Sequence, residues 1–271
     1  MKYKLIALDL DGTLTDSNKL VLPKTAAILK RLAQKGVIIT LASGRPTPGM
    51  HYVADTVELE KGGYVLSFNG AKIINWRTKE VVYQKTYDKS IGHQVIDRAR
   101  EYNLCSISYS DEAILTQTPE DEYTIEEGRI NNMELLKVSD IKTVLDDNVD
   151  KLLLTGDGDY LAKIVDEFKQ PFEGQLAIYR SQPFFIEVMA EGIDKAQSLD
   201  SLIKELNIKQ EEVIAFGDGY NDLSMIEFAG LGVAMENACD EVKQKADTIT
   251  LSNDEDGIAH ILEHLELNGA F

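Results

Sequence analysis

The sequence has little cysteine and a deficit of positive charge. Only two cysteines, Cys105 and Cys239, occur in 271 residues, and their wide separation argues against a structural disulfide and fits a reducing compartment. The 28 lysines and arginines are outnumbered by 46 aspartates and glutamates, which gives a formal net charge of -18. Such a negative surface repels nucleic acid and anionic membranes, so we expect neither as a partner.

Long hydrophobic runs are absent as well. No apolar run approaches the ~20 residues that a membrane helix needs. The N-terminal apolar run is interrupted by Asp9 and is too short and too charged for a signal peptide, so we expect a cytoplasmic protein. The 44% of hydrophobic residues can build one large core or two moderate ones. No heptad repeat indicates an oligomer, and monomer and dimer both stay open.

Both ends of the chain alternate between strand and helix patterns. The helix expected near the start has Pro23 close to its beginning and Gly36 at its end. A strand, a helix and a second apolar strand in succession are typical of a parallel βαβ unit. Helix and strand patterns alternate again from residue 195 onward. The apolar, strand-like segments of the first third are residues 4–10, 37–43, 64–70 and 71–76.

The middle of the chain has a different pattern. Its strand-like segments come in close pairs after helical segments, which indicates hairpins and a mixed or antiparallel sheet. Residues 120–150 are acidic, and we expect them to be irregular. We predict a discontinuous α/β core domain formed by residues 1–83 and 189–271, with a second domain inserted at residues 84–188.

Polar residues stand where the predicted strands of the core end. Asp9 and Asp11 end the first strand, Ser43 ends the second, and Asp218 follows a later one, while Lys195 begins a helix after the insert. In an open parallel sheet, reactive groups gather at the carboxyl ends of the strands. In an extended strand Asp11 would also point to the same side as Asp9. Holding two carboxylates of like charge so close together costs free energy unless a cation binds between them.

Magnesium is the cation that these residue types favour. Mg²⁺ takes oxygen ligands and binds through a few carboxylates together with substrate phosphate. Asp9 and Asp218 are the candidate ligands. With the metal in place Asp9 can attack phosphorus, because the metal screens the repulsion between carboxylate and phosphate. Asp11 can protonate the departing oxygen and then help to deprotonate the water that hydrolyses the aspartyl-phosphate.

The remaining polar residues suit the binding of a phosphoryl group. Ser43 and the backbone N–H groups of Gly44 and Arg45 can hold phosphate oxygens at the start of a helix. Lys195 can neutralise the charge that builds on the transferring group.

Four stretches, in this order along the chain, resemble the signatures of the haloacid dehalogenase-like hydrolases. They are DLDGTLT (Asp9–Thr15), LASGR (Leu41–Arg45), GIDKA (Gly192–Ala196) and GDGYND (Gly217–Asp222). The long insert between the second and the third is similar to that of the Cof-type metabolite phosphatases. The resemblance implies a Rossmann-like parallel-sheet core, a mobile α/β cap of the C2 type inserted after the third core strand, and magnesium-dependent hydrolysis of phosphate esters.

The resemblance also implies a role for each matching residue. Asp9 is similar to the family's nucleophile, and Asp11 to its general acid and base. The residues that match metal positions are Asp9, Asp11, Asp218 and Asp222, the last acting through water. The residues that match phosphate contacts are the Leu10 backbone, Ser43, Gly44, Lys195 and Asn221.

The substrate is less defined than the chemistry. Resemblance to the Cof-type enzymes favours sugar phosphates, and other small phosphorylated metabolites, including phosphorylated cofactors, stay open. A phosphomutase would use the same residues but pass the phosphoryl group to a second hydroxyl instead of water. A receiver-type phosphoacceptor module would keep the aspartyl-phosphate as a signal, although a receiver has no need of the large insert.

Overall fold

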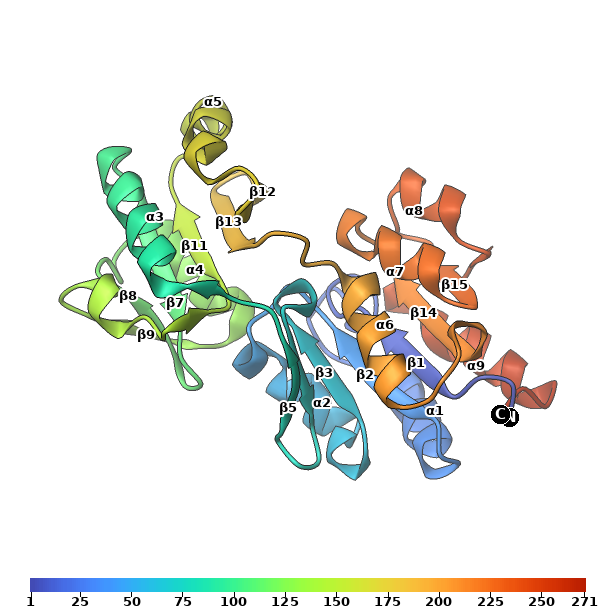
Figure 1. Cartoon of the computed structure of the whole chain (residues 1–271). Helices are drawn as coiled ribbons and strands as arrows, with labels where there is room; N and C mark the ends of the chain where they lie inside the picture. Colours follow the sequence, from blue (N-terminus) through green and yellow to red (C-terminus); the bar gives the residue numbers. More distant parts are fainter. The chain divides into compact units, whose positions relative to one another are not determined.

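The computed structural model describes residues 1–271, which divide into two compact units (Figure 1). The first unit comprises Met1–Gly44, Met50–Tyr83 and Asp194–Phe271, and the second comprises Arg45–Gly49 and Gln84–Ile193. The expected boundary after residue 83 coincides with one of these limits. The expected boundary after residue 188 lies inside the strand Phe185–Ala190, and the second unit continues to Ile193. The short segment Arg45–Gly49 was expected in the core but belongs to the second unit.

The first unit is built on an eight-stranded sheet. Its first six strands, counted from the edge strand β16 to β3, are all parallel to their neighbours, and β4 is antiparallel to β3. The order is β16 (Thr248–Ile249), β15 (Leu231–Ala234), β14 (Val213–Gly217), β1 (Leu5–Leu8), β2 (Ile38–Ala42), β3 (Tyr64–Ser67), β4 (Lys72–Asn75) and β5 (Val81–Gln84).

Helices cover both faces of this sheet, because its central strands are apolar on both sides. Ile6 and Leu8 of β1 pack toward one helical layer, and Leu5 and Ala7 pack toward the other. The first layer contains α1 (Pro23–Gln34), α2 (His51–Thr56) and α9 (Gly257–Leu267). The second contains α6 (Lys195–Glu205), α7 (Leu223–Phe228) and α8 (Asp240–Lys245). No helix combines the length and the apolar character that crossing a membrane requires.

Local signals account for the limits of α1 and for the meeting of the chain ends. Pro23 is the first residue of α1, where a missing N–H costs nothing, and Gly36 follows the helix with a φ of 94°. The backbone N–H of Lys2 donates to the carbonyl of Ala270 at 2.7 Å, so the two ends of the chain lie side by side in the first unit (Figure 1).

The second unit contains a six-stranded sheet and a separate two-stranded one. Only β8 and β9 pair in parallel in the larger sheet, so the expected mixed sheet is confirmed. Its order is β12 (Leu176–Gln182), β13 (Phe185–Ala190), β11 (Leu152–Thr155), β7 (Cys105–Tyr109), β8 (Ala113–Thr116) and β9 (Glu134–Lys137). The two-stranded sheet pairs β6 (Tyr87–Asp88) with β10 (Asn148–Val149).

Helices cover the two faces of the larger sheet unequally. The apolar residues of α3 (Lys89–Glu101) and α5 (Gly158–Lys169) pack on one face, and those of α4 (Glu122–Asn131) pack on the other. The expectation of an irregular stretch at residues 120–150 was wrong, because this stretch contains α4 and β9. Asp121 caps α4 by accepting the N–H of Thr124 at 2.8 Å, a start signal that the surrounding acidic residues obscured.

The topology of the first unit brings three strand ends together. β1 lies between β2 and β14, and all three are parallel. Asp9 follows β1, Ser43 follows β2 and Asp218 follows β14, so these residues emerge at one edge of the sheet. β1 ends at Leu8, and therefore the expectation that strand alternation orients Asp11 was wrong: Asp11 lies in the turn beyond the strand.

Candidate active site

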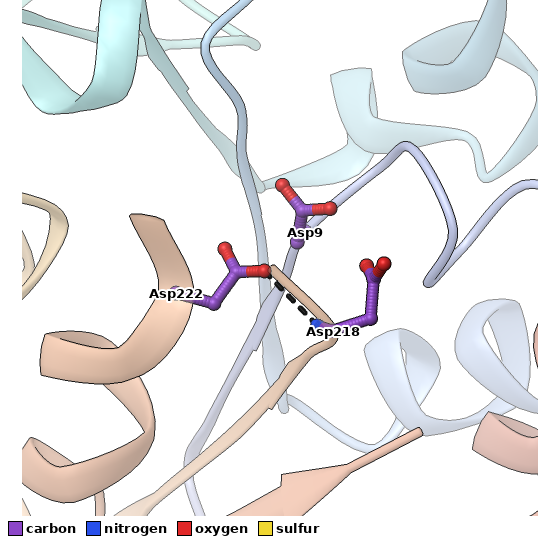
Figure 2. Close-up of side chains that lie close together, drawn as sticks. All are labelled: Asp9, Asp218 and Asp222. Carbon is purple, nitrogen blue, oxygen red and sulfur yellow. Dashed lines mark hydrogen bonds between the residues drawn. The ribbon is translucent and has the colours of Figure 1, made fainter. Parts of the chain in front are cut away.

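Three carboxylates converge at the carboxyl edge of the sheet (Figure 2). One ligand oxygen each of Asp9, Asp218 and Asp222 lies within 4.8 Å of the others. Asp222 is completely buried, and its Oδ2 accepts the backbone N–H groups of Asp218 at 3.0 Å and Gly219 at 2.9 Å. The short turn after β14 therefore fixes Asp222 from behind and leaves Asp9 and Asp218 to face one another.

Lys195 is the buried cation of this group. Its Nζ donates to Oδ1 of Asp9 at 2.7 Å and to Oδ1 of Asp222 at 2.6 Å, and the residue is only 1% exposed. Lys195 is the first residue of α6, which Asp194 caps by accepting the N–H of Ala196 at 2.9 Å. The cap fixes where α6 begins and so where the lysine enters the site.

Burial and mutual repulsion shift the pKa values of these groups. Burial raises the pKa of Asp9 well above its usual value, and the charge of Asp222 adds to this rise, which Lys195 opposes. Burial also raises the pKa of Asp218 to about 6, against a hydrogen bond from Thr13 that lowers it. For Lys195 burial lowers the pKa, but the carboxylates of Asp222 and Asp9 outweigh burial and the net shift is upward. The raised pKa values show that Lys195 alone does not fully compensate the ionised carboxylates, so a further cation would stabilise their charged forms.

A glycine and a threonine after β1 position Asp218. Gly12 has a φ of 82°, and a Cβ atom added to it would lie 2.4 Å from Oδ2 of Asp218. Thr13 donates its hydroxyl to Oδ1 of the same carboxylate at 2.7 Å, and Asn237 donates to the carbonyl of Gly12 at 2.7 Å. Only glycine fits between the turn and the carboxylate, and this close approach explains the DG pair of the first motif.

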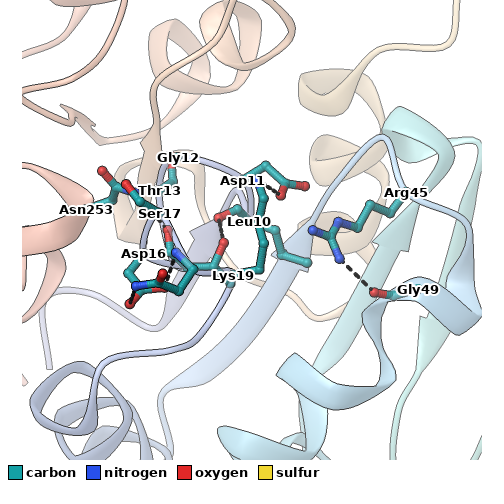
Figure 3. Close-up of polar contacts among 12 residues, drawn as sticks. Leu10, Asp11, Gly12, Thr13, Asp16, Ser17, Lys19, Arg45, Gly49 and Asn253 are labelled. Atoms are coloured by element: carbon teal, nitrogen blue, oxygen red, sulfur yellow. Dashed lines mark hydrogen bonds and ion pairs between the residues drawn. The ribbon is translucent and has the colours of Figure 1, made fainter. Parts of the chain in front are cut away.

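Asp11 is not one of the three converging carboxylates, and it lies in the loop that also contains Asp16 and Lys19 (Figure 3). Its Oδ1 accepts a hydrogen bond from Nζ of Lys19 at 2.8 Å. Lys19 reaches back because Asp16 closes the intervening turn, accepting the backbone N–H groups of Asn18 at 2.9 Å and Leu20 at 2.8 Å. Asp11 is thus partly exposed, and its partner is the flexible side chain of an exposed lysine.

Apart from Lys195, the residues assigned to phosphate binding lie in the segments that follow β1, β2 and β14. Ser43 is 3% exposed, and its backbone N–H donates to the carbonyl of Leu66 at 2.9 Å. The carbonyl of Leu10 accepts the hydroxyl of Thr15 at 2.9 Å, which fixes the turn after Asp9. The side chain of Asn221 is exposed and donates to Oδ1 of Asn69 at 3.1 Å.

Arg45 is the one candidate that lies outside the first unit. Its guanidinium donates to the carbonyl of Gly49 at 3.2 Å (Figure 3), and the segment that contains both belongs to the second unit. The other predicted residues, from Asp9 to Asp222, all belong to the first unit. Their assigned roles stay predictions.

Three residues that contact the candidates received no firm role from the sequence. Thr13 binds Asp218, Lys19 binds Asp11, and Asn69 binds Asn221. Thr13 belongs to the first motif, so its place in the motif was an available signal. The Asn69–Gly70 pair is typical of a turn, and the family resemblance leaves a minor contact near the site open for it. No local pattern predicts the contact of Lys19 with Asp11.

The donor set fits a hard divalent cation. Asp9 and Asp218 offer carboxylate oxygens that face one another, and neither nitrogen nor sulfur ligands stand in the group. Both oxygens of Asp222 already accept hydrogen bonds from the protein, which suits a role through water. A metal at this place would be held by Asp9 and Asp218, with Asp222 behind them.

Comparisons with known proteins agree with the fold and identify the family. The sequence profile of the haloacid dehalogenase-like hydrolases matches residues 6–262. YxeH of Bacillus subtilis (strain 168) is 33% identical over 98% of this chain and 99% of its own length. The 5-amino-6-(5-phospho-D-ribitylamino)uracil phosphatase YitU of the same organism is 30% identical over 97% of both chains. The crystal structure of a haloacid dehalogenase-like hydrolase from Bacteroides thetaiotaomicron has a TM-score of 0.95 and 42% identity, covering 97% of this chain and all of the other.

Fold, site and relatives together define a hydrolase with a parallel-sheet core and an inserted second unit. The chain belongs to the haloacid dehalogenase-like hydrolase family. The family, the Rossmann-like fold class and the enzyme class, a phosphatase of this family, are therefore confirmed.

Proposed function

We propose that the protein hydrolyses phosphate monoesters of small metabolites through an aspartyl-phosphate on Asp9, with Mg²⁺ as cofactor. The observation that carries this proposal is the placement of Asp9. It lies at the carboxyl end of a central strand, in hydrogen-bond contact with the buried Lys195 and within ligand distance of Asp218. A carboxylate in that position has a cation on one side and a metal-binding partner on the other.

The residues divide the reaction into two displacements. In the first, a carboxylate oxygen of Asp9 forms a bond to phosphorus while the bond from phosphorus to the leaving oxygen breaks, and Asp11 gives that oxygen its proton. In the second, Asp11 takes a proton from water as the water oxygen bonds to phosphorus. The bond from phosphorus to Asp9 then breaks, and orthophosphate leaves.

The other residues position the phosphoryl group and balance its charge. Ser43, the Gly44 backbone and Asn221 are assigned to its oxygens, and Lys195 supplies a fixed positive charge beside Asp9. Magnesium bound by Asp9 and Asp218 would supply further positive charge, which screens the carboxylate from the phosphate. The general position of Asp11, outside the metal group and near solvent, suits exchange of a proton with leaving group and water.

We further propose a phosphorylated sugar or sugar alcohol as the substrate class. The proposal is supported by YitU, whose name states a substrate with a phosphorylated ribityl chain. The net charge of -18 means that an anionic substrate must be attracted locally, which Lys195 and the metal would do.

The direct test is a phosphate-release assay with trapping of the intermediate. The purified protein is incubated with Mg²⁺ and a panel of sugar, sugar-alcohol and cofactor phosphates, and both orthophosphate and the alcohol product are quantified. Equal amounts of the two products are expected, whereas a phosphomutase would release no orthophosphate. Rapid acid quenching and mass spectrometry should find one phosphoryl group on the peptide that contains Asp9.

A matched pair of variants isolates the nucleophile. Asp9→Asn should abolish turnover and labelling, while Asp200→Asn, at a partly exposed aspartate of α6, should retain both. Turnover by Asp9→Asn at the wild-type rate would contradict the proposed nucleophile. Full activity of the wild type in EDTA would contradict the proposed cofactor.

A further inference from the structure

A turn with unusual backbone geometry follows β3. Phe68, Asn69 and Gly70 have φ values of 53°, 54° and 96°, so three successive residues occupy the left-handed region. Asparagine and glycine tolerate this region, but phenylalanine rarely adopts it. Such a conformation persists only where the surrounding structure imposes it, and it is found disproportionately at functional sites.

Hydrogen bonds from two sides hold this turn. The backbone N–H of Asn69 donates to the carbonyl of Ser43 at 2.9 Å. On the other side, the hydroxyl of Ser198 donates to the carbonyl of Gly70 at 2.7 Å. Ser198 lies one turn after Lys195 on α6, so the Phe68–Gly70 turn connects the end of β2 with the helix that carries the buried lysine.

The side chain of Asn69 faces two of the residues assigned to phosphate binding. Its Oδ1 accepts a hydrogen bond from Nδ2 of Asn221 at 3.1 Å. The same oxygen would lie 3.1 Å from a Cβ atom at Gly44, so the carboxamide packs against the Gly44 backbone. One side chain thus contacts residues that follow two different strands.

We infer that Asn69 is a positioning residue for the phosphoryl group. One hydrogen of the Asn221 amide is committed to Asn69, which fixes the rotation of that amide and directs its second hydrogen away from Asn69, toward an oxyanion acceptor. Contact with Gly44 and the hydrogen bond to Ser43 fix the neighbouring backbone turn in the same way. The inference rests on the proposed function, because it takes Ser43, Gly44 and Asn221 as the phosphate contacts.

Glycine substitution tests the side chain without adding backbone strain, because glycine accepts positive φ values. Asn69→Gly should weaken inhibition by orthophosphate, measured with p-nitrophenyl phosphate and Mg²⁺, by about fivefold to tenfold, the effect of losing one net hydrogen bond between neutral groups. The matched control is Asn207→Gly, at an exposed asparagine with a φ of 53° after α6. The control should leave the inhibition constant unchanged.

Two further variants separate positioning from a merely structural role. Asn69→Asp keeps the size and the acceptor for Asn221 but places a negative charge beside Gly44, so it should weaken phosphate inhibition more than Asn69→Gly does. A structural role predicts the opposite order, because Asp is the closer match in shape. In an Asn221→Ala background, Asn69→Gly should lose most of its effect.

The outcomes distinguish this inference from the proposed function. A wild type that turns over substrate, with an inhibition constant that Asn69→Gly does not alter, would overturn the positioning role alone. An unchanged effect of Asn69→Gly in the Asn221→Ala background would overturn it too. A wild type that neither hydrolyses phosphate esters nor binds orthophosphate would overturn the proposed function and this inference with it.

Discussion

Replacement of Lys195 by methionine should destabilise the first unit strongly at pH 8 in EDTA. The lysine is paired with Asp9 and Asp222, both buried, and methionine keeps its length but removes its charge. Removing one partner of a buried ion pair costs about 3–5 kcal/mol, because the remaining charge is left without compensation. We expect the free energy of unfolding to fall by an amount in that range.

Proton linkage gives the sign of the pH dependence. The pKa of Asp9 is already raised in the folded protein and should rise further without Lys195, so folded Lys195→Met binds more protons than its unfolded chain near pH 5. A group whose pKa is raised on folding loses stability as the pH rises through the folded value. The penalty of Lys195→Met should therefore be smaller at pH 5 than at pH 8, and Mg²⁺ at pH 8 should reduce it.

Urea denaturation followed by tryptophan fluorescence measures the free energy of unfolding of the first unit, which contains Lys195. Trp76 is the only tryptophan of the sequence and is buried in the core of the first unit, at 3% exposure. The control is Lys204→Met, at an exposed lysine of the same helix, which should change stability by less than about 1 kcal/mol. Equal stabilities of the two variants at pH 8 in EDTA, or a larger penalty of Lys195→Met at pH 5, would refute the reasoning.

Three further changes probe the remaining groups of the site. Asp11→Asn should lower kcat by ~10²-fold or more with little effect on the thermal midpoint, and steady-state kinetics showing kcat near the wild-type value would contradict its proton-transfer role. Gly12→Ala should displace the Asp218 carboxylate and weaken Mg²⁺ binding, which titration calorimetry would detect; an unchanged binding constant would contradict the close approach of the turn. Asp218→Asn should gain stability relative to the wild type as the pH rises from 4 to 7 in EDTA, by at most about 3 kcal/mol, because the folded pKa of Asp218 is about 6 and its unfolded pKa is near 3.9. A gain that shrinks with rising pH in urea titrations would contradict this shift.

Much of the first unit could be predicted because its strands are short apolar runs with clear turn signals. β1, β2 and β14 are buried on both faces, and short apolar, β-branched runs between turn signals are typical of central strands. The helix α1 could be predicted from its apolar spacing together with Pro23 and Gly36. These signals are local, so they are legible without knowledge of the tertiary contacts.

The stretch that contains α4 could not be predicted, because tertiary contacts support it. Glu127 and Asn131 are buried in α4, and Gly128 stands in its middle, so the helix lacks a simple division into apolar and polar faces. Tyr109 donates its hydroxyl to Glu127 at 2.7 Å, which provides a partner for the buried carboxylate. Such a helix depends on residues that are remote in the sequence.

The site divides in a similar way. Asp9 and Asp218 were predicted to lie close together because each follows a strand, and Asp222 because it belongs to the same motif as Asp218. Their convergence requires only that β1 and β14 are parallel neighbours. The environment of Asp11 depends instead on the turn closed by Asp16, and that of Asn221 depends on the left-handed turn at Asn69. Loop geometry is set by individual hydrogen bonds, which leave a weak trace in the sequence.

The adjacency of Lys2 and Ala270 offers a route to a circularly permuted chain. A short linker between Met1 and Phe271, with new ends opened between Ile193 and Asp194, would make the discontinuous unit continuous from Asp194 through to Tyr83, apart from the five residues Arg45–Gly49. The long insert would then hang from a single terminus, where a protease site could remove it. Cleavage of one peptide bond would then release the insert, and the activity of the first unit could be measured without it.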